Sequence, residues 1–242
     1  MVMITALANP KKFLDFSRAI LPWTCAAAVI LLGVGFYWSL FATPPDYQQG
    51  QSVKIMFVHV PAAWMGIFVY SVMAGASLVG LVFRHPLADV AAKSAAPLGA
   101  AFTALALLTG SLWGRPMWGT YWQWGDARLV SELILLFIYL GYIALWNAID
   151  DPVRAARAAA VLSLVGAADV PVIHFSVDWW NTLHQPASIL RLGGPTIDKS
   201  FLAPLLIMII GYTFLFLWLW LLRMQTEILE RRARSLMMAR GA

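Results

Sequence analysis

The sequence predicts an all-α fold, a polytopic membrane protein in which residues 1–242 form a single domain of six transmembrane helices with both termini in the cytoplasm. Composition is the first indication, since 61% of the residues are apolar and only 12% are charged. The second is that the apolar residues form continuous blocks of about 20, the length of helix that crosses a hydrocarbon core roughly 30 Å thick. Strands of a transmembrane barrel are about 10 residues long and alternate in polarity, so these blocks favour helices.

The apolar blocks and the residues that end them define the predicted helices. Two prolines after Thr43 prevent the first block from continuing as a helix. A charged tail at residues 223–242 follows the last block, and we expect it to form a short amphipathic helix at the membrane surface or in solvent. The predicted helices cover residues 20–41, 57–83, 96–112, 131–148, 158–179 and 201–222.

The distribution of basic residues predicts the orientation. Cytoplasmic loops carry the excess of Lys and Arg in inner-membrane proteins, so the richer side is assigned to the cytoplasm. The outer loops are then residues 44–56, 113–130 and 178–200, and the net charge of +5 reflects topology and does not indicate a nucleic-acid partner. Twelve of the seventeen Lys and Arg fall on the cytoplasmic side: Lys11, Lys12, Arg18, Arg84, Lys93, Arg154, Arg157, Arg223, Arg231, Arg232, Arg234 and Arg240. The other five, in the outer loops, are Lys54, Arg115, Arg128, Arg191 and Lys199.

The second outer loop is the most distinctive segment of the chain. Its sequence, WGRPMWGTYWQWGDARLVSE, is interrupted by glycine and proline and lies between two apolar blocks. An indole ring combines a large rigid apolar surface with one N–H donor, so a cluster of them suits a flat, hydrophobic, partly polar ligand. Haem has that shape. The aromatic residues of this loop are Trp113, Trp118, Tyr121, Trp122 and Trp124.

Membrane anchoring is the competing interpretation of the tryptophans. A tryptophan at a helix end is usually an interface anchor, which accounts for Trp23, Trp38 and Trp146. Four tryptophans within twelve residues exceed what anchoring needs. The cluster therefore favours ligand binding over membrane anchoring as the role of these tryptophans.

Two histidines lie beside this loop in the predicted topology. His59 follows the first outer loop and His184 lies in the third, and two neutral imidazoles on opposite faces of a haem would supply both axial ligands. A single histidine near a membrane surface is more often a cap or interface residue, but two on one side favour ligation. His85 is expected to be solvated on the cytoplasmic side. Asp169 and His174 are expected to have a structural role at a proline kink.

The N-terminal region and the one cysteine limit the other possibilities. Residues 1–18 contain no apolar core followed by a small-residue cleavage site, so we expect the first helix to act as its own insertion signal. Cys25 lies within that helix, and the chain has no C-x-x-C-H motif. Any haem would therefore be held non-covalently.

Three blocks of sequence together closely resemble a known family. YQQGQSVKIMFVHVPAAW, WGRPMWGTYWQWGDARLVSELILLF and HFSVDWWNTLHQP occur in that order and resemble the haem exporter protein C (CcmC) family of bacterial cytochrome c maturation. The resemblance covers the chain from the first predicted helix to the sixth. It implies a non-enzymatic protein of the bacterial inner membrane that binds haem b at the periplasmic surface and hands it to the haem chaperone CcmE.

The resemblance also implies partners and residue roles. The partners are the ABC subunits CcmA and CcmB and the small protein CcmD; ATP hydrolysis would belong to CcmA, since no Walker A sequence occurs here. His59 in FVHVPAA and His184 in WWNTLHQ match the axial ligands. The residues that fall in the family's "WWD" motif are Trp113, Trp118, Trp122, Trp124, Asp126 and Arg128.

Charged groups near the aromatic loop complete the candidate site. Lys54, Arg128 and Arg191 are candidates to neutralise the two haem propionates. Asp126 is expected either to orient Arg128 or a tryptophan N–H, or to cap the fourth helix. Two positions depart from the family's pattern. Gly125 adds a residue between Trp124 and Asp126, where we expect unusual backbone angles to absorb it, and Lys54 stands where the family commonly has arginine.

Two other functions are consistent with a haem-binding membrane protein. A b-type redox protein would use His59 with His184 or His174 to pass electrons to a quinone, but such proteins bury their haem well inside paired helices. A haem permease would need polar groups along its helices, where Asp169 stands nearly alone. Histidines next to surface loops favour release over retention, and thus a haem-transfer protein.

Overall fold

A computed structural model describes residues 9–186, 188–189 and 192–241. Six segments of this described chain are long and apolar enough to cross a membrane, as predicted. Two of the helices, α6 and α7, share one of those segments. The helices are α2 (Pro10–Tyr37), α3 (Met56–Phe83), α4 (Ala88–Trp118), α5 (Ala127–Ala148), α6 (Pro152–Gly166), α7 (Asp169–Trp179) and α8 (Lys199–Gly241). A π-helical turn, Trp38–Ala42, continues α2, and a 3-10 turn, Gln51–Ile55, precedes α3.

Several helices begin earlier than predicted because polar caps, and not hydropathy, set their first residues. The Asn9 side chain accepts a hydrogen bond from the Lys11 backbone N–H at 2.9 Å, which starts α2 ten residues before the apolar block. Asp151 caps α6 in the same way through the Arg154 N–H at 2.7 Å. An apolar block marks the part of a helix that crosses the membrane, whereas the cap satisfies the free N–H groups at its start.

The end of α4 corrects the expectation that Trp113 and Trp118 lie on a loop. The helix continues through Pro116 and ends at Gly119, whose φ of 77° is the left-handed conformation that stops helices. Proline removes one N–H donor, but near the end of a helix this loss is small enough for the helix to continue. The irregular segment is therefore confined to residues 119–126.

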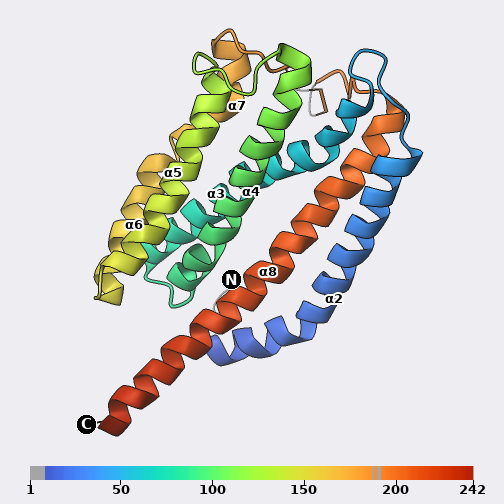
Figure 1. Ribbon diagram of the computed structural model, residues 1–242. Helices are drawn as coiled ribbons and strands as arrows, with labels where there is room; N and C mark the ends of the chain where they lie inside the picture. Colours follow the sequence, from blue (N-terminus) through green and yellow to red (C-terminus); the bar gives the residue numbers. More distant parts are fainter. Residues whose placement is uncertain (1–8, 187, 190–191, 242) are drawn as a thin grey trace.

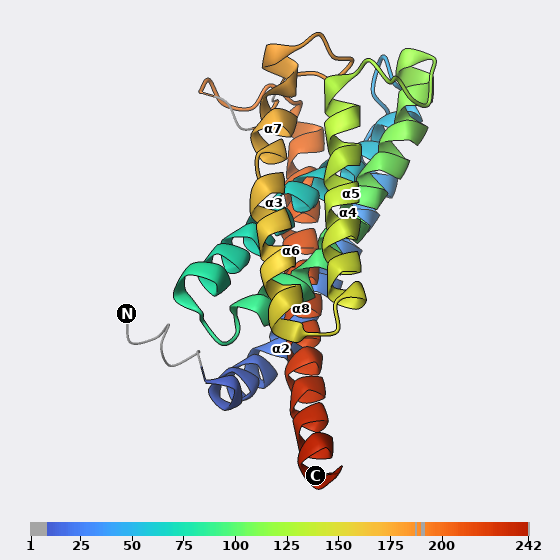
Figure 2. The ribbon, with the colours of Figure 1, turned by 90° about the vertical axis from the view of Figure 1, so that its left-hand side faces the viewer.

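The fifth and sixth predicted helices also differ from the structure. The fifth is broken at residues 167–168, one turn before Pro171, whose ring would crowd the carbonyl of residue 167 in a continuous helix and which has no N–H to donate to it. Figure 2 shows that α7 nonetheless stands almost in line above α6. The tail at residues 223–242 was expected to be a separate amphipathic helix, but through Gly241 it continues α8. Ion pairs one turn apart support this continuation, with Arg231 Nε 2.7 Å from Glu227 Oε1.

The helices form two flanking groups around a central pair (Figure 1). Helices α2 and α8 contact each other along one side, while α5, α6 and α7 lie on the other. Between them, α3 and α4 pack closely, and α4 also contacts α5 and α8. A buried hydrogen bond from the Tyr139 hydroxyl to the Gly66 carbonyl oxygen, at 2.9 Å, ties α5 to α3. The central pair thus provides a rigid support for residues at its ends.

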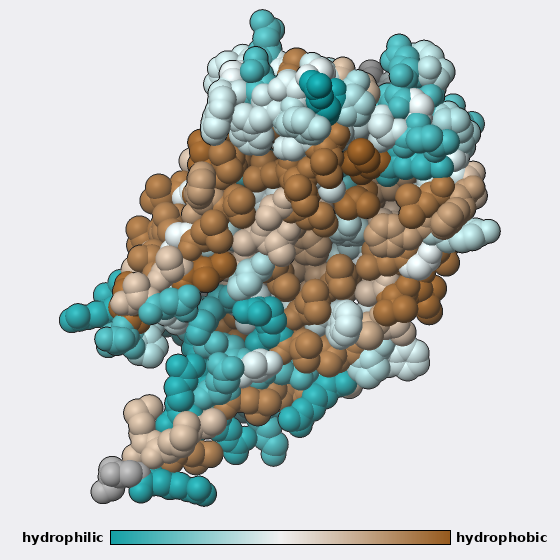
Figure 3. Space-filling view, viewed as in Figure 1, coloured by the Kyte–Doolittle hydropathy of each residue, from teal (hydrophilic) through white to brown (hydrophobic). Residues whose placement is uncertain are grey.

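The bundle has two polar ends separated by an apolar band (Figure 3). We call one the loop end, formed by residues 43–55, 119–126, 180–186, 188–189 and 192–198. The other is the tail end, formed by the first turns of α2, residues 84–87 and 149–151, and the last turns of α8. The first turns of α2 and the last turns of α8 therefore share one end, as the six-helix topology predicts.

Candidate functional site

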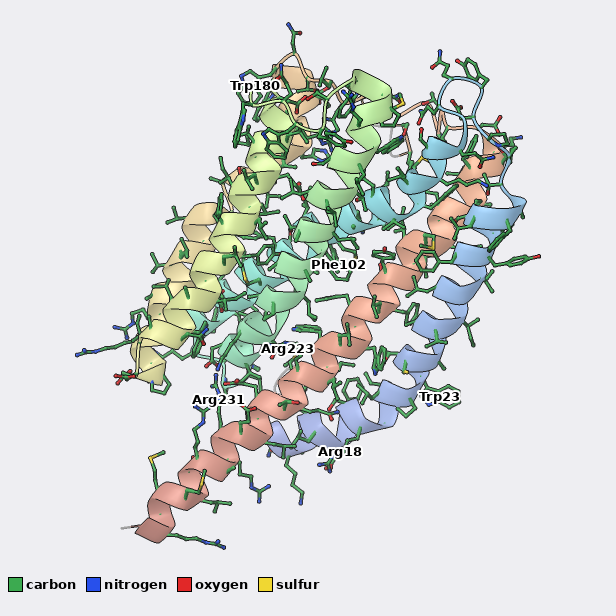
Figure 4. The ribbon with its side chains drawn as sticks, viewed as in Figure 1. Arg18, Trp23, Phe102, Trp180, Arg223 and Arg231 are labelled. Atoms are coloured by element: carbon green, nitrogen blue, oxygen red, sulfur yellow. The ribbon has the colours of Figure 1, made fainter. Side chains whose placement is uncertain are left out.

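The described candidate residues of the site lie at or beside the loop end, where several helices begin or end; Figure 4 shows both ends of the bundle. Trp180, which follows α7, marks this end in the figure, and Arg18 and Arg231 mark the opposite one. His59 lies in the first turn of α3, and Trp113 and Trp118 lie in the last two turns of α4. The site is therefore built from helix ends together with two irregular segments.

His59 is held against α4 by a hydrogen bond that determines which ring nitrogen carries the proton. Its Nδ1 lies 3.0 Å from the Ala106 carbonyl oxygen and 3.3 Å from Thr109 Oγ1. A carbonyl oxygen only accepts, so Nδ1 is the donor and Nε2 keeps its lone pair for a metal. Gly110 permits this close approach, because a Cβ there would lie 2.8 Å from His59 Cε1. The edge of Trp113 packs on the ring at a centroid distance of 5.7 Å.

His184 is held by two groups, Trp118 at the end of α4 and Asp126 at the start of α5. The Trp118 and His184 rings meet edge to face with centroids 5.0 Å apart. Its Nδ1 lies 3.5 Å from Asp126 Oδ1, a close approach that is too long for a strong hydrogen bond. Burial lowers the pKa of the His184 imidazole below its usual value, so the ring is neutral at neutral pH. A neutral imidazole is the form that ligates a metal.

Asp126 links helix α5 to the segment that carries His184. Its side chain is almost fully buried, and Oδ1 accepts a hydrogen bond from the Leu129 N–H at 3.0 Å, which caps α5. Its other oxygen, Oδ2, accepts from the Leu183 N–H at 2.7 Å. The capping interpretation of Asp126 is therefore confirmed. The second bond was not predicted, since residues 57 positions apart are joined by the tertiary fold.

Three aromatic side chains of the irregular segment are partly or largely open to the surroundings. Trp122 is half-buried, whereas Trp124 is 74% exposed and Tyr121 is 58% exposed. The rings of Trp122 and Trp124 meet edge to face at 5.4 Å, and the Arg115 guanidinium lies over the Tyr121 ring at 5.7 Å. Indole and phenol faces are thus available at the surface of the loop end.

Gly125 does not use the unusual backbone angles expected of it. Its φ is not positive, unlike that of Gly119, and a Cβ at Gly125 would meet no atom within 4 Å. The extra residue is accommodated in an open stretch of chain. Gly119, at the end of α4, is the glycine whose conformational freedom the segment requires.

The two basic candidates that the structure describes have different surroundings. Arg128 is half-buried in the first turn of α5, within electrostatic range of both His59 and His184. Lys54 is engaged elsewhere, since its Nζ donates to the Leu40 carbonyl oxygen at 2.6 Å. Arg191 lies outside the described residues. Of the described basic candidates, Arg128 is therefore the one grouped with the two histidines.

The other polar residues differ in their surroundings, and one buried carboxylate oxygen of Asp169 has no hydrogen-bond partner among the described residues. The exposed His174 contacts Phe175 in α7, with ring centroids 4.7 Å apart. At the tail end, His85 Nδ1 accepts from the Leu87 N–H at 3.3 Å. Sequence reasoning missed Gln49, whose side-chain oxygen accepts from the Trp113 indole N–H at 3.0 Å.

Comparison with known proteins identifies the family. The family model described as "Heme exporter protein C" (CcmC) matches residues 3–239. The chain is 66% identical over 236 residues to the heme exporter protein C of Bradyrhizobium diazoefficiens, an alignment that covers 98% of this chain and 89% of that protein. It is 47% identical over 231 residues to that of Paracoccus denitrificans, covering 95% of each. It is 46% identical over 223 residues to that of Escherichia coli K12, covering 92% of this chain and 89% of that protein. The chain therefore belongs to the heme exporter protein C (CcmC) family.

Proposed function

We propose that this membrane protein binds haem b at its loop end, with His59 and His184 as the two axial ligands, and passes it to a CcmE-like chaperone. As a member of the CcmC family it is a haem-handling protein of cytochrome c maturation, not an enzyme. Haem is the cargo here, and the protein makes or breaks no bond within it. The observation that carries the proposal is the pair of imidazoles at one end of the bundle, each supported by a tryptophan of α4.

The chemistry of the two rings supports a shared iron. His59 presents an unprotonated Nε2, because its Nδ1 donates to a backbone carbonyl. The Asp126 carboxylate close to Nδ1 of His184 favours a proton on that atom, which leaves Nε2 free there as well. Each ring is thus held through Nδ1, and both can ligate through Nε2.

The surrounding residues suit the rest of a haem molecule. The exposed rings of Tyr121 and Trp124 and the half-buried ring of Trp122 offer apolar faces to a porphyrin. Arg128, near both histidines, is the candidate to neutralise a propionate. Lys54 is a weaker candidate, because one of its N–H donors already serves the Leu40 carbonyl, and Arg191 is proposed from the sequence alone.

Haem transfer is favoured over permanent retention by the surface position of the site. His184 lies on an irregular segment, not within paired helices, and the Trp124 ring, also in the loop end, is largely exposed. The one cysteine, Cys25, lies in α2 and would not attach a haem at the loop end. We propose CcmA, CcmB and a CcmD-like protein as further partners.

Axial ligation is tested by haem titration of the purified protein. Replacing either His59 or His184 by alanine should convert a six-coordinate visible spectrum into a five-coordinate one, or abolish haem binding. His85→Ala, at the tail end, is the control and should leave the spectrum unchanged. Loss of the spectrum in His174→Ala together with its retention in His184→Ala would instead support a redox protein.

The loop end is proposed to face the periplasm, because most basic residues lie toward the tail end. Single cysteines at the exposed positions Gln123 and Met237 test this orientation in intact cells, with Cys25 replaced by serine. A membrane-impermeant thiol reagent should label Gln123→Cys from outside. It should label Met237→Cys only after the inner membrane is opened, and the reverse pattern would overturn the orientation.

A further inference from the structure

A cavity lies at the tail end, away from the candidate haem site. It has a volume of about 700 Å³, within the range of small-molecule binding sites. Its walls come from three segments distant in sequence: the first turns of α2, the connection between α3 and α4, and α8 from Ile228 to Ser235. Figure 4 labels Arg18 and Arg231, one from each of the two helices that border it.

The floor of this tail cavity is apolar and well packed. Leu14, Leu87, Val90 and Ile228 line it, and each is less than 9% exposed. They belong to a small hydrophobic cluster that is separate from the main core of the bundle. Leu229, which is 44% exposed, extends the apolar wall outward. Hydrocarbon placed on this floor would be removed from water, which is favourable.

The rim of the cavity is positively charged. Arg231 is already neutralised, with Nη1 2.7 Å from Asp89 Oδ2 and Nε 2.7 Å from Glu227 Oε1. Three further cations line the rim against the single remaining carboxylate, Asp15, and none of them makes an ion pair within the described chain. These cations are Lys11, Arg18 and Arg232.

The start of α2 strengthens the positive potential at the rim. Asn9 and Pro10 line the cavity, so the amino-terminal end of a 28-residue helix borders it. The partial positive charge at such an end favours an anion. A neutral occupant would make no use of this charge.

The cavity lies at the depth of lipid headgroups. The apolar stretch of α8 ends at Leu222, and Ile228 is six residues further, about 9 Å along the helix axis. The headgroup layer on each side of a bilayer is roughly 5 to 8 Å thick, half the difference between a core of 30 Å and a whole bilayer of 40 to 45 Å. Ile228 is therefore at the outer edge of this layer, while the cluster that forms the floor also contains Leu221, at the end of the apolar stretch. An apolar floor and a basic rim thus meet where a phospholipid places its acyl chains and its phosphate.

We propose that the tail cavity binds one anionic phospholipid of the adjoining leaflet. Its phosphate would lie at Lys11, Arg18 and Arg232, and an acyl chain would lie on the apolar floor described above. A free phosphate would leave the floor unused. A partner helix, about 10 Å across, would need a longer groove than this volume provides. The proposal is independent of haem binding and concerns the opposite end of the molecule.

Lipid retention tests the proposal. The full-length protein is placed in nanodiscs of equal parts phosphatidylglycerol and phosphatidylcholine, and native mass spectrometry measures the lipids that it retains. We expect preferential retention of phosphatidylglycerol, and an affinity about 25-fold lower in Arg18→Ala/Arg232→Ala, at about fivefold for each cation near a membrane surface. The matched control is Arg154→Ala/Arg157→Ala, which removes the same charge from exposed positions of α6 outside the cavity.

Three results would overturn the proposal. The first is equal retention of the two lipids by the unaltered protein. The second is an equal loss of phosphatidylglycerol in the two double variants, which would reduce the effect to net charge. The third is binding of inorganic phosphate as tightly as phosphatidylglycerol in detergent, since the acyl chain would then contribute nothing.

A photoreactive residue identifies the occupant directly. Leu229→p-benzoylphenylalanine places the probe at the exposed apolar wall, where the change should not disturb folding. Irradiation in membranes should yield lipid adducts. Crosslinks to residues 1–8, to a second copy of the chain or to another protein would show a different occupant and refute the assignment.

Discussion

Asp126 offers the sharpest test of how the site is held together. One of its oxygens caps α5 through the Leu129 N–H, and the other holds the His184 segment through the Leu183 N–H at 2.7 Å. An Asp126→Asn side chain has one acceptor oxygen in place of two. Because asparagine caps helices about as well as aspartate, we expect the cap to survive and the bond to Leu183 to be lost.

The size of this effect follows from the bond that is lost. A hydrogen bond to a charged group contributes about 1.5 to 3 kcal/mol. If the ordered position of the His184 segment is destabilised by that free energy, fewer molecules hold His184 where it can ligate the haem iron. The apparent haem affinity then falls by about tenfold to a hundredfold. Asp126→Ala loses the cap as well, a further cost of about 1 kcal/mol to the stability of α5.

The assay is a haem titration followed by visible spectroscopy, normalised to the amount of protein in the membrane. Asp126→Asn should reach normal protein levels while showing weaker binding and a partly five-coordinate spectrum. The matched control is Asp151→Asn, which alters an equivalent cap at the start of α6, at the tail end. Normal affinity and full six-coordination in Asp126→Asn would refute the idea that this carboxylate positions His184.

Two further substitutions examine the other parts of the site. Gly110→Ala would bring a Cβ to 2.8 Å from the His59 ring, so we expect the ring to turn away and haem binding to weaken. Gly75→Ala is the control, because a Cβ there meets nothing within 4 Å. Equal haem spectra of the two variants would contradict this expectation. Trp122→Ala should lose roughly 1.5 to 3 kcal/mol of haem binding, or about tenfold to a hundredfold in affinity, while Trp122→Phe keeps most of it. Trp146→Ala, at the tail end, controls for membrane anchoring, and equal haem occupancy per molecule in the two alanine variants would remove Trp122 from the site.

The membrane-crossing helices could be predicted because they depend on local properties of the sequence. The second predicted helix, residues 57–83, differs from α3 by one residue at its start. Long apolar blocks are sufficient for this, since backbone groups in a bilayer must be satisfied within the helix. The end of α4 was harder to predict, because Gly114 and Pro116 are typical of a break. There the helix tolerates both and stops only at Gly119.

The contacts of the candidate site could be predicted only in part. The histidines and the aromatic segment are visible in the sequence as unusual clusters. Their partners are not, because the Ala106 carbonyl that holds His59 carries no signal of its own, and the bond between Asp126 and Leu183 depends on the packing of α5 beside α7. Among these contacts, only the approach of His59 to α4 has a visible feature in the sequence, which is the glycine at position 110.

The two histidines are held in ways that suit different parts of a transfer reaction. His59 belongs to α3, and its ring is fixed by a carbonyl of α4, so its position does not depend on a ligand. His184 belongs to an irregular segment that is held near the ring by the Asp126 carboxylate and the Trp118 ring. A rigid ligand can receive haem in a defined position, whereas a ligand on a segment with few ties can withdraw at a modest free-energy cost. Under the proposed function, we therefore expect release to begin with the bond to His184, and the haem to leave on that side.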